Sequence, residues 1–170
     1  MSGATSSGGL QTKEAQAFAA RLFAAQPALK EYAPSHSDDR EVASSRSVLE
    51  MPCPNPNIPD GMMVWMVDGT DPSLTFGRWH THASLFDGSV DAGWDGLIDY
   101  VGAILTDQFV LVREVGTRRD WVQILDLREQ DALADLLTSS FCSGTVDLLT
   151  WSGLGDRRVS LNDLELAPAR

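Results

Sequence analysis

The chain has 170 residues, 43% of them hydrophobic and 22% charged, and its formal net charge is −11. This size and composition are typical of one globular domain that can bury a core without disulfides or metals. The acidic balance excludes non-specific binding to nucleic acid, which needs basic residues to neutralise phosphates, and docking on an anionic membrane. It favours a basic partner instead.

The N-terminus is rich in glycine and serine, which predicts a disordered tail at 1–9 followed by a single folded domain at 10–170. The tail lacks the apolar stretch of a signal peptide, and no apolar run in the chain reaches the roughly 18 residues of a membrane span. The two cysteines, Cys53 and Cys142, belong to no Cys-x-x-Cys motif. These features predict a cytoplasmic protein with two free thiols, with a disulfide between them as the alternative.

The first half of the chain predicts a helix followed by strands. Apolar residues at helical spacing begin just after Thr12, a typical N-cap residue, and this helix either ends at Pro27 or continues from it as a short extra turn. A mixed segment at 41–51 predicts an edge strand, and the four prolines at 52–59 exclude regular structure. The run 62–67 is apolar on both faces and predicts a buried central strand.

The remaining chain alternates helices with hairpins. A turn cluster precedes a strand predicted at 74–83, which forms a hairpin with the strand before it. Asp91 is a candidate N-cap for a second helix with an apolar face. Further elements are a hairpin of strands 110–115 and 121–125, a helix at 127–137, and a hairpin of strands 146–151 and 158–164. This order predicts an α+β fold with a mostly antiparallel sheet built from hairpins and packed by about three helices.

The run Trp79-His80-Thr81-His82 is the most unusual local feature of the sequence. On a strand, His80 and His82 would share one face, where two imidazoles can bind a single zinc ion. A zinc ion held there could activate water, as in a metal-dependent hydrolase. The structural alternative is two neutral histidines hydrogen-bonded at the end of a strand. Candidate further ligands are Glu50, Cys53, Asp87, Asp91 and Asp95.

His80-Thr81-His82 resembles the first part of the metal-binding motif of the JAMM deubiquitinase class. That motif is His-[Ser/Thr]-His, seven residues, and then Ser-x-x-Asp. In this chain Val90 stands at the serine position and Gly93 at the aspartate position. The spacing therefore departs from the family's pattern, which puts the third metal ligand and the activity in doubt.

A stretch of the chain that contains aspartates but no basic residue follows the two histidines. No lysine or arginine lies between His80 and Val112, and Asp91, Asp95 and Asp99 are spaced by four residues along the predicted second helix. Like charges at this spacing destabilise a helix by about 0.2–0.5 kcal/mol per pair, which indicates a separate role in binding a cation or a cationic partner. The alternative is an ordinary solvated helix face.

Three glycines interrupt the same helix, at positions 93, 96 and 102, and lower its helix propensity. They could permit close packing against the sheet or the close approach of a partner. Catalytic motifs are absent from the sequence, which has no nucleophile elbow, phosphate-binding loop or dinucleotide fingerprint. No catalytic residue is therefore predicted.

The run Phe76-Gly77-Arg78-Trp79-His80-Thr81-His82, with Trp151-Ser152-Gly153 later in the chain, resembles a Gly-x-Trp-His-x-His segment of small acidic bacterial proteins of unknown function. Some of those proteins are similar to immunity proteins of toxin systems. The resemblance implies a binding protein that neutralises a toxin, often a basic nuclease, and it carries over no catalytic residue.

Charge and resemblance together predict a cytoplasmic immunity-type protein that binds a basic protein partner. The predicted partner-binding residues are Asp87, Asp91, Asp95, Asp99 and Trp79. Trp79 is included because, on a strand, it points away from the face that carries the two histidines. The alternatives are a metal-dependent hydrolase that uses His80 and His82, and a domain with no dedicated site.

Overall fold

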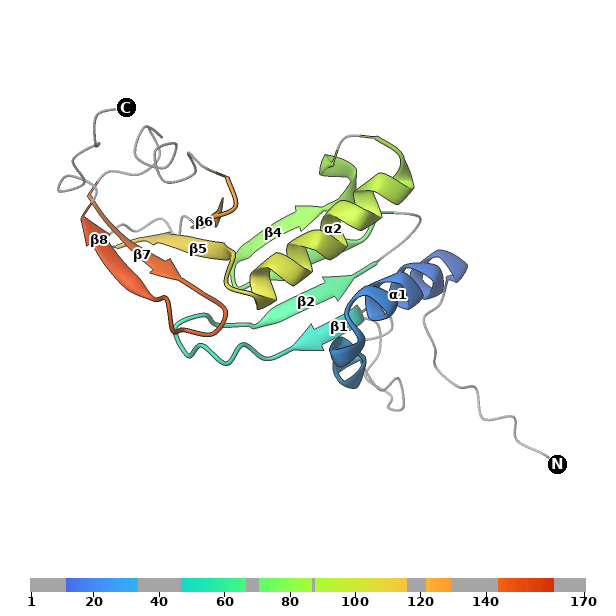
Figure 1. Ribbon diagram of the computed structural model, residues 1–170, viewed down its shortest axis with the longest axis horizontal. Helices are drawn as coiled ribbons and strands as arrows, with labels where there is room; N and C mark the ends of the chain where they lie inside the picture. The colour runs from blue at the N-terminus through green and yellow to red at the C-terminus, as the bar shows by residue number, and fades with distance from the viewer. Residues whose placement is uncertain are drawn as a thin grey trace. The chain divides into compact units, whose positions relative to one another are not determined.

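The structure is a computed structural model that describes residues 12–33, 47–66, 71–86, 88–115, 122–129 and 144–160. The predicted tail at 1–9, Asp87 and Cys142 lie outside these residues. Within them, the strands form two four-stranded antiparallel sheets accompanied by helices, which confirms the α+β class (Figure 1). Among the described residues, no helix is long and apolar enough to cross a membrane.

The chain groups into two compact units whose segments alternate along the sequence. The first unit comprises Met1–Pro52, Gly61–Phe76 and His80–Asp99, and the second comprises Cys53–Asp60, Gly77–Trp79 and Tyr100–Arg170. Each unit contains one of the two sheets, apart from Trp79 at the start of the last strand of the first sheet. The single domain predicted at 10–170 stays a prediction.

The first sheet is a meander of consecutive strands. Its order is β1 (Ser47–Met51), β2 (Met62–Trp65), β3 (Ser73–Phe76) and β4 (Trp79–His82). The predicted edge position of β1, the central position of β2 and the β2–β3 hairpin are confirmed. Burial alternates along β2, because Met62 and Val64 are buried while the residue after each of them is half-buried.

The single strand predicted at 74–83 is wrong, because a tight turn at Gly77 and Arg78 divides it into β3 and β4. Gly77 has φ +56°, a conformation that two-residue hairpin turns require and that glycine adopts without strain. A Cβ added to Gly77 would lie 3.1 Å from Cγ2 of Ile58, so the turn is also closely packed. The faces predicted for Trp79, His80 and His82 therefore refer to β4 alone.

The first helix begins and ends as predicted. In α1 (Lys13–Ala25), the N-cap Thr12 accepts a hydrogen bond from the Ala15 amide at 3.0 Å. The predicted extra turn is the short helix η1 (Pro27–Tyr32). The buried face of α1 includes Phe18, whose ring packs edge-to-face on Trp94 of the second helix with centroids 5.5 Å apart.

The second helix is α2 (Val90–Leu105), which follows the short helix η3 (Ala83–Leu85). The predicted N-cap, Asp91, is wrong by two residues: the Ser89 hydroxyl accepts a hydrogen bond from the Ala92 amide at 3.3 Å, and Asp91 lies in the first helical turn. There its charge still meets the positive end of the helix dipole.

The second sheet joins two hairpins. Its order is β6 (Val122–Asp126), β5 (Phe109–Glu114), β7 (Thr145–Leu149) and β8 (Arg157–Ser160). The predicted hairpins β5–β6 and β7–β8 are confirmed, and β5 pairs with β7 to connect them. The helix predicted at 127–137 is a turn in its described part, 127–129, and the rest lies outside the described residues.

Candidate functional site

The aspartates of α2 lie on its exposed side, as the helical spacing predicted. Two of them share one cation: Nη1 of Arg21 on α1 lies 2.8 Å from Oδ1 of Asp91, and Nη2 lies 2.6 Å from Oδ2 of Asp95. The Asp91 and Asp95 side chains are 79% and 62% exposed. Asp99 is exposed one turn further along the helix, and Asp87 lies outside the described residues. The surface formed by Asp91, Asp95 and Asp99, here named the acidic face of α2, therefore already holds one guanidinium.

The glycines of α2 serve internal packing at two of their three positions. A Cβ on Gly93 would lie 2.6 Å from the carbonyl oxygen of Ala83, and one on Gly96 would lie 2.5 Å from the ring of Phe86. Both distances are too short for a real Cβ. Of the two roles predicted for these glycines, the structure supports close packing within the protein at Gly93 and Gly96.

The two histidines of β4 have different surroundings. His80 is exposed, whereas His82 is half-buried and its Nδ1 lies 2.7 Å from Oγ of the buried Ser73 on β3. Their ring centroids are 5.6 Å apart. Among the described residues, no group of three or more His, Cys, Asp or Glu side chains is placed to hold a metal ion. The zinc site at His80 and His82 stays a prediction, which elemental analysis of the purified protein decides.

Trp79 begins a row of packed aromatic rings in the second unit. It stacks on Tyr100 with centroids 6.2 Å apart, and Tyr100 meets Phe109 edge-to-face at 4.4 Å. The guanidinium carbon of Arg128 lies 5.0 Å from the centroid of the Phe109 ring. Trp79 is half-buried by this packing, so part of its ring stays accessible. Its role in partner binding remains a prediction.

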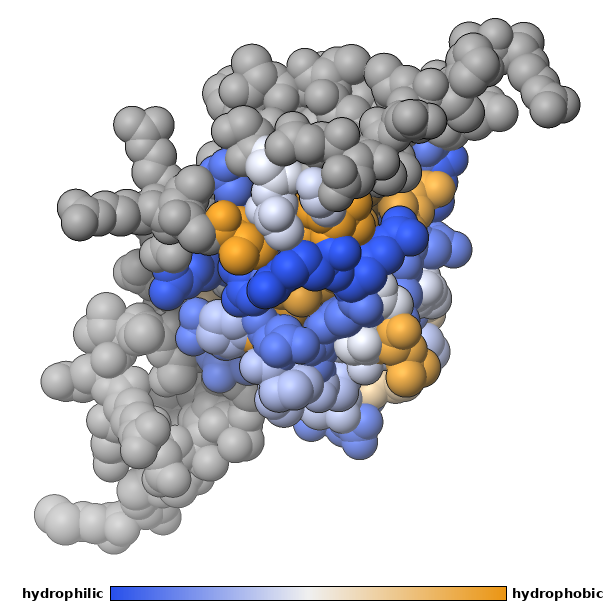
Figure 2. Space-filling view, turned by 90° about the vertical axis from the view of Figure 1, so that its left-hand side faces the viewer, coloured by the Kyte–Doolittle hydropathy of each residue, from blue (hydrophilic) through white to orange (hydrophobic). Residues whose placement is uncertain are grey.

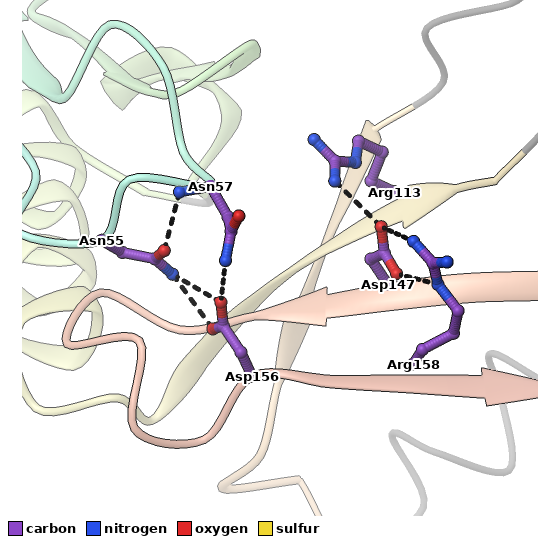
Figure 3. Close-up of polar contacts among 6 residues, drawn as sticks. All are labelled: Asn55, Asn57, Arg113, Asp147, Asp156 and Arg158. Atoms are coloured by element: carbon purple, nitrogen blue, oxygen red, sulfur yellow. Dashed lines mark hydrogen bonds and ion pairs between the residues drawn. The ribbon is translucent and has the colours of Figure 1, made fainter.

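A polar row that the sequence analysis missed crosses one face of the second sheet. Strand register places Asp147 of β7 opposite Arg113 of β5 on one side and opposite Arg158 of β8 on the other. Asp147 is 6% exposed; it accepts hydrogen bonds from Nη2 of Arg113 at 2.9 Å and from Nε of Arg158 at 2.7 Å (Figure 3). The hydrogen bond from Arg158, with a further one from Arg113, lowers the pKa of the Asp147 carboxyl below its usual value.

A second missed network anchors the proline-rich loop at 53–60 to the β7–β8 turn. Asn55, 1% exposed, donates from Nδ2 to the Thr150 carbonyl at 2.7 Å and to the Asp156 carboxylate. Asn57 donates to the same carboxylate at 3.0 Å (Figure 3). The Thr150 amide also donates to this carboxylate, at 2.8 Å. Asp156 therefore has its oxygens occupied by donors from both segments, which fixes the position of Asn57.

The spacing of residues along the sequence did not predict these ion pairs and hydrogen bonds, because the two residues of each pair lie far apart in the chain. Arg113 and Asp147 are separated by 34 residues, and Arg21 and Asp95 by 74. A signal does exist for Asp147. It is a charged residue within the predicted strand 146–151, and a buried charge there needs a cationic neighbour on an adjacent strand.

No protein-family model matches this chain, and neither does any curated protein or solved structure. The resemblance to small acidic proteins with a Gly-x-Trp-His-x-His segment therefore stays a prediction.

Proposed function

We propose that this chain is a cytoplasmic, immunity-type binding protein that binds a basic protein partner through the acidic face of α2. The observation that supports the proposal is the position of Arg21. Two carboxylates one helical turn apart each accept one end of a single guanidinium, at 2.8 and 2.6 Å. The same arrangement suits an arginine presented by a partner, since guanidinium and carboxylate groups are complementary in shape and charge.

Because the acidic face of α2 is exposed, a cationic group of a partner can replace Arg21 on it. Ion pairs between exposed groups contribute only about 0–1 kcal/mol, so a partner's arginine can displace Arg21 at low cost. Asp99, one turn beyond Asp95, is a further exposed acidic residue of this face. The net charge of −11 would steer a basic protein towards the chain and raise the rate of association.

Charge reversal on the acidic face tests the proposal. The test variant is Asp95→Lys with Asp99→Lys, and the matched control is Glu31→Lys with Glu50→Lys, which changes net charge equally at two exposed sites on other elements. The probe is a fluorescent arginine-rich peptide whose binding is followed by anisotropy. We expect the test variant to bind about tenfold more weakly and the control to change by less than about threefold. Equal losses in the two variants would show that only net charge matters and would contradict the proposal.

The immunity role needs a separate test, because peptide binding measures only whether the acidic face of α2 binds a basic ligand. The protein encoded beside this chain's gene is the natural candidate for a toxin. We expect growth arrest by that protein to be relieved by the wild-type chain and not by the Asp95→Lys, Asp99→Lys variant. Relief by neither chain, with both proteins expressed and folded, would contradict the immunity role.

A further inference from the structure

The second sheet has two chemically different faces. One carries an apolar cluster formed by Val110, Val112, Leu125, Val146 and Leu148. Because side chains alternate along each strand, the other face carries the remaining positions, which include the polar row of Arg113, Asp147 and Arg158. Leu111 and Leu149 pair with each other on that second face. Apolar and charged side chains therefore lie next to one another there, and such mixed surface is visible in Figure 2.

Two adjoining hollows lie over this second face. The smaller has a volume of about 140 Å³, and its apolar lining includes Leu111, Leu149 and Val122. Arg78, at the tip of the β3–β4 turn, and Arg113 supply its charge, and no carboxylate of the described residues lines it. The larger, of about 330 Å³, shares Arg113 and Leu149 with the smaller, but it also contains Asp147 and Asp156. An anion is therefore favoured in the smaller hollow, here named the Arg78–Arg113 hollow.

Asp147 holds the Arg113 guanidinium in position and leaves most of its N–H donors able to bind such a ligand. Among the described residues, the Arg113 side chain donates one hydrogen bond, from Nη2 to Asp147. Four of the five N–H donors of its guanidinium therefore remain for a ligand. Figure 3 shows the rest of the guanidinium turned away from Asp147. The Arg113 side chain is 42% exposed, so these donors are accessible to a ligand. A planar guanidinium held in this way can bind a carboxylate through two parallel hydrogen bonds.

The walls of the hollow are held in place before any ligand arrives. Asn57 lines it and is fixed by its hydrogen bond to Asp156, within the network that anchors the loop at 53–60. Gly77 packs closely against both Ile58 and Leu111, since a Cβ added to it would lie 3.1 and 3.3 Å from their side-chain carbons. This packing fixes the turn that carries Arg78. A preformed site avoids the cost of ordering these groups on binding.

From this geometry we infer that the Arg78–Arg113 hollow binds a carboxylate attached to a small hydrocarbon group. The carboxylate lies against Arg113 and Arg78, and the hydrocarbon lies on Leu111, Leu149 and Val122. Size limits the ligand, because a cavity of about 150 Å³ accommodates a benzene ring. Both a small organic acid and the C-terminal residue of a peptide carry this chemistry. The inference is independent of the acidic face of α2, which belongs to the first unit.

Calorimetry on the intact chain tests the inference with sodium benzoate and a short peptide that ends in leucine. Benzamide and the amidated peptide are the uncharged counterparts, and inorganic phosphate is the anion without hydrocarbon. We expect benzoate or the free-ended peptide to bind, and each uncharged counterpart to bind at least about tenfold more weakly. Benzoate alone identifies a small acid as the ligand, and the peptide alone identifies a chain end. Binding by neither, or phosphate binding as tightly as the bound carboxylate, would overturn the inference.

Three variants locate the site. Arg78→Gln removes one charge from the hollow and leaves the Arg113–Asp147 hydrogen bond in place, while Val122→Phe fills the hollow without changing charge. Arg157→Gln is the matched control, because it removes one charge from the larger hollow only. We expect the first two to weaken carboxylate binding by about tenfold and the control by less than about threefold. An equal loss in Arg78→Gln and Arg157→Gln, or unchanged binding in Val122→Phe, would place the ligand elsewhere and overturn the inference.

Discussion

Arg21 on α1 and Asp95 on α2, separated by 74 residues in the sequence, are joined by an ion pair of 2.6 Å at the surface of the first unit. The sequence predicted the exposed position of Asp95 on a helix but not this partner. The pair reduces the negative charge that the acidic face of α2 presents to other molecules, and it makes Arg21 a competitor of any cationic ligand.

Removing that competitor is expected to strengthen binding. Arg21→Ala frees Asp91 and Asp95, so we expect the arginine-rich peptide to bind a few fold more tightly than it binds the wild type. Stability should fall by only about 0.2–1 kcal/mol, because both carboxylates are exposed. Anisotropy and urea unfolding measure the two effects. Unchanged or weaker peptide binding would show that the peptide does not use these two carboxylates.

Alanine at the packed glycines of α2 is expected to destabilise the protein despite its higher helix propensity. The new Cβ at position 93 meets the backbone of Ala83, which cannot move aside, and we expect a loss of about 1–3 kcal/mol that exceeds the roughly 1 kcal/mol gained from propensity. At position 96 the obstacle is the Phe86 ring, a side chain. Adding Phe86→Ala should therefore recover part of the loss caused by Gly96→Ala. Urea unfolding of the single and double variants tests both statements, and strictly additive losses would contradict the second.

The hydrogen bond between Ser73 and His82 is expected to contribute to stability. Ser73→Ala leaves His82 Nδ1 without this partner, and we expect a loss of about 1 kcal/mol. Ser84→Ala is the control, because the Ser84 side chain also takes part in a hydrogen bond, which it donates to Asp71, but Ser84 is exposed. If Ser84→Ala lowers stability as much as Ser73→Ala does, burial does not determine how much these hydrogen bonds contribute to stability.

The lowered pKa of Asp147 predicts a specific dependence of stability on pH. The carboxyl has a folded-state pKa below its unfolded value of about 3.9, so the folded state binds the proton less readily. Its contribution to stability is therefore fully present above that unfolded value and is lost as pH falls through the folded pKa. We expect Asp147→Asn to be less stable than the wild type at neutral pH, and the difference to shrink in acid. A difference that stays constant between neutral pH and strong acid would contradict the assignment.

Cys53 is expected to be a slow nucleophile. Burial, as the largest cause, raises the pKa of its thiol, and Sγ lies 3.4 Å from the Trp151 carbonyl oxygen, to which it donates a hydrogen bond. In a Cys142→Ser background, which isolates this thiol, we expect the reaction with a disulfide reagent at neutral pH to be much slower than in urea. Equal rates in the two conditions would show that Cys53 is open to solvent in the folded protein.

The local elements of this protein could be predicted from its amino-acid sequence. Thr12 capped the first helix as predicted, the helical spacing of Asp91, Asp95 and Asp99 placed them on one exposed face, and the hairpins β5–β6 and β7–β8 followed from alternating runs bounded by turn residues. Capping, periodicity and turn preference act over a few residues, so they can be read along the chain.

The contacts between residues far apart in the chain depend instead on tertiary packing. The division of residues 74–83 by the Gly77 turn depended on a positive φ that the sequence permits but does not require. The contacts of Arg21 with Asp95, and of Arg113 and Arg158 with Asp147, depend on helix packing and on strand register. Strand register is fixed by burial of a whole sheet face, and a shift of one residue would send Asp147 to the opposite face. For this reason the sequence, whose net charge is strongly negative, did not predict the basic Arg78–Arg113 hollow.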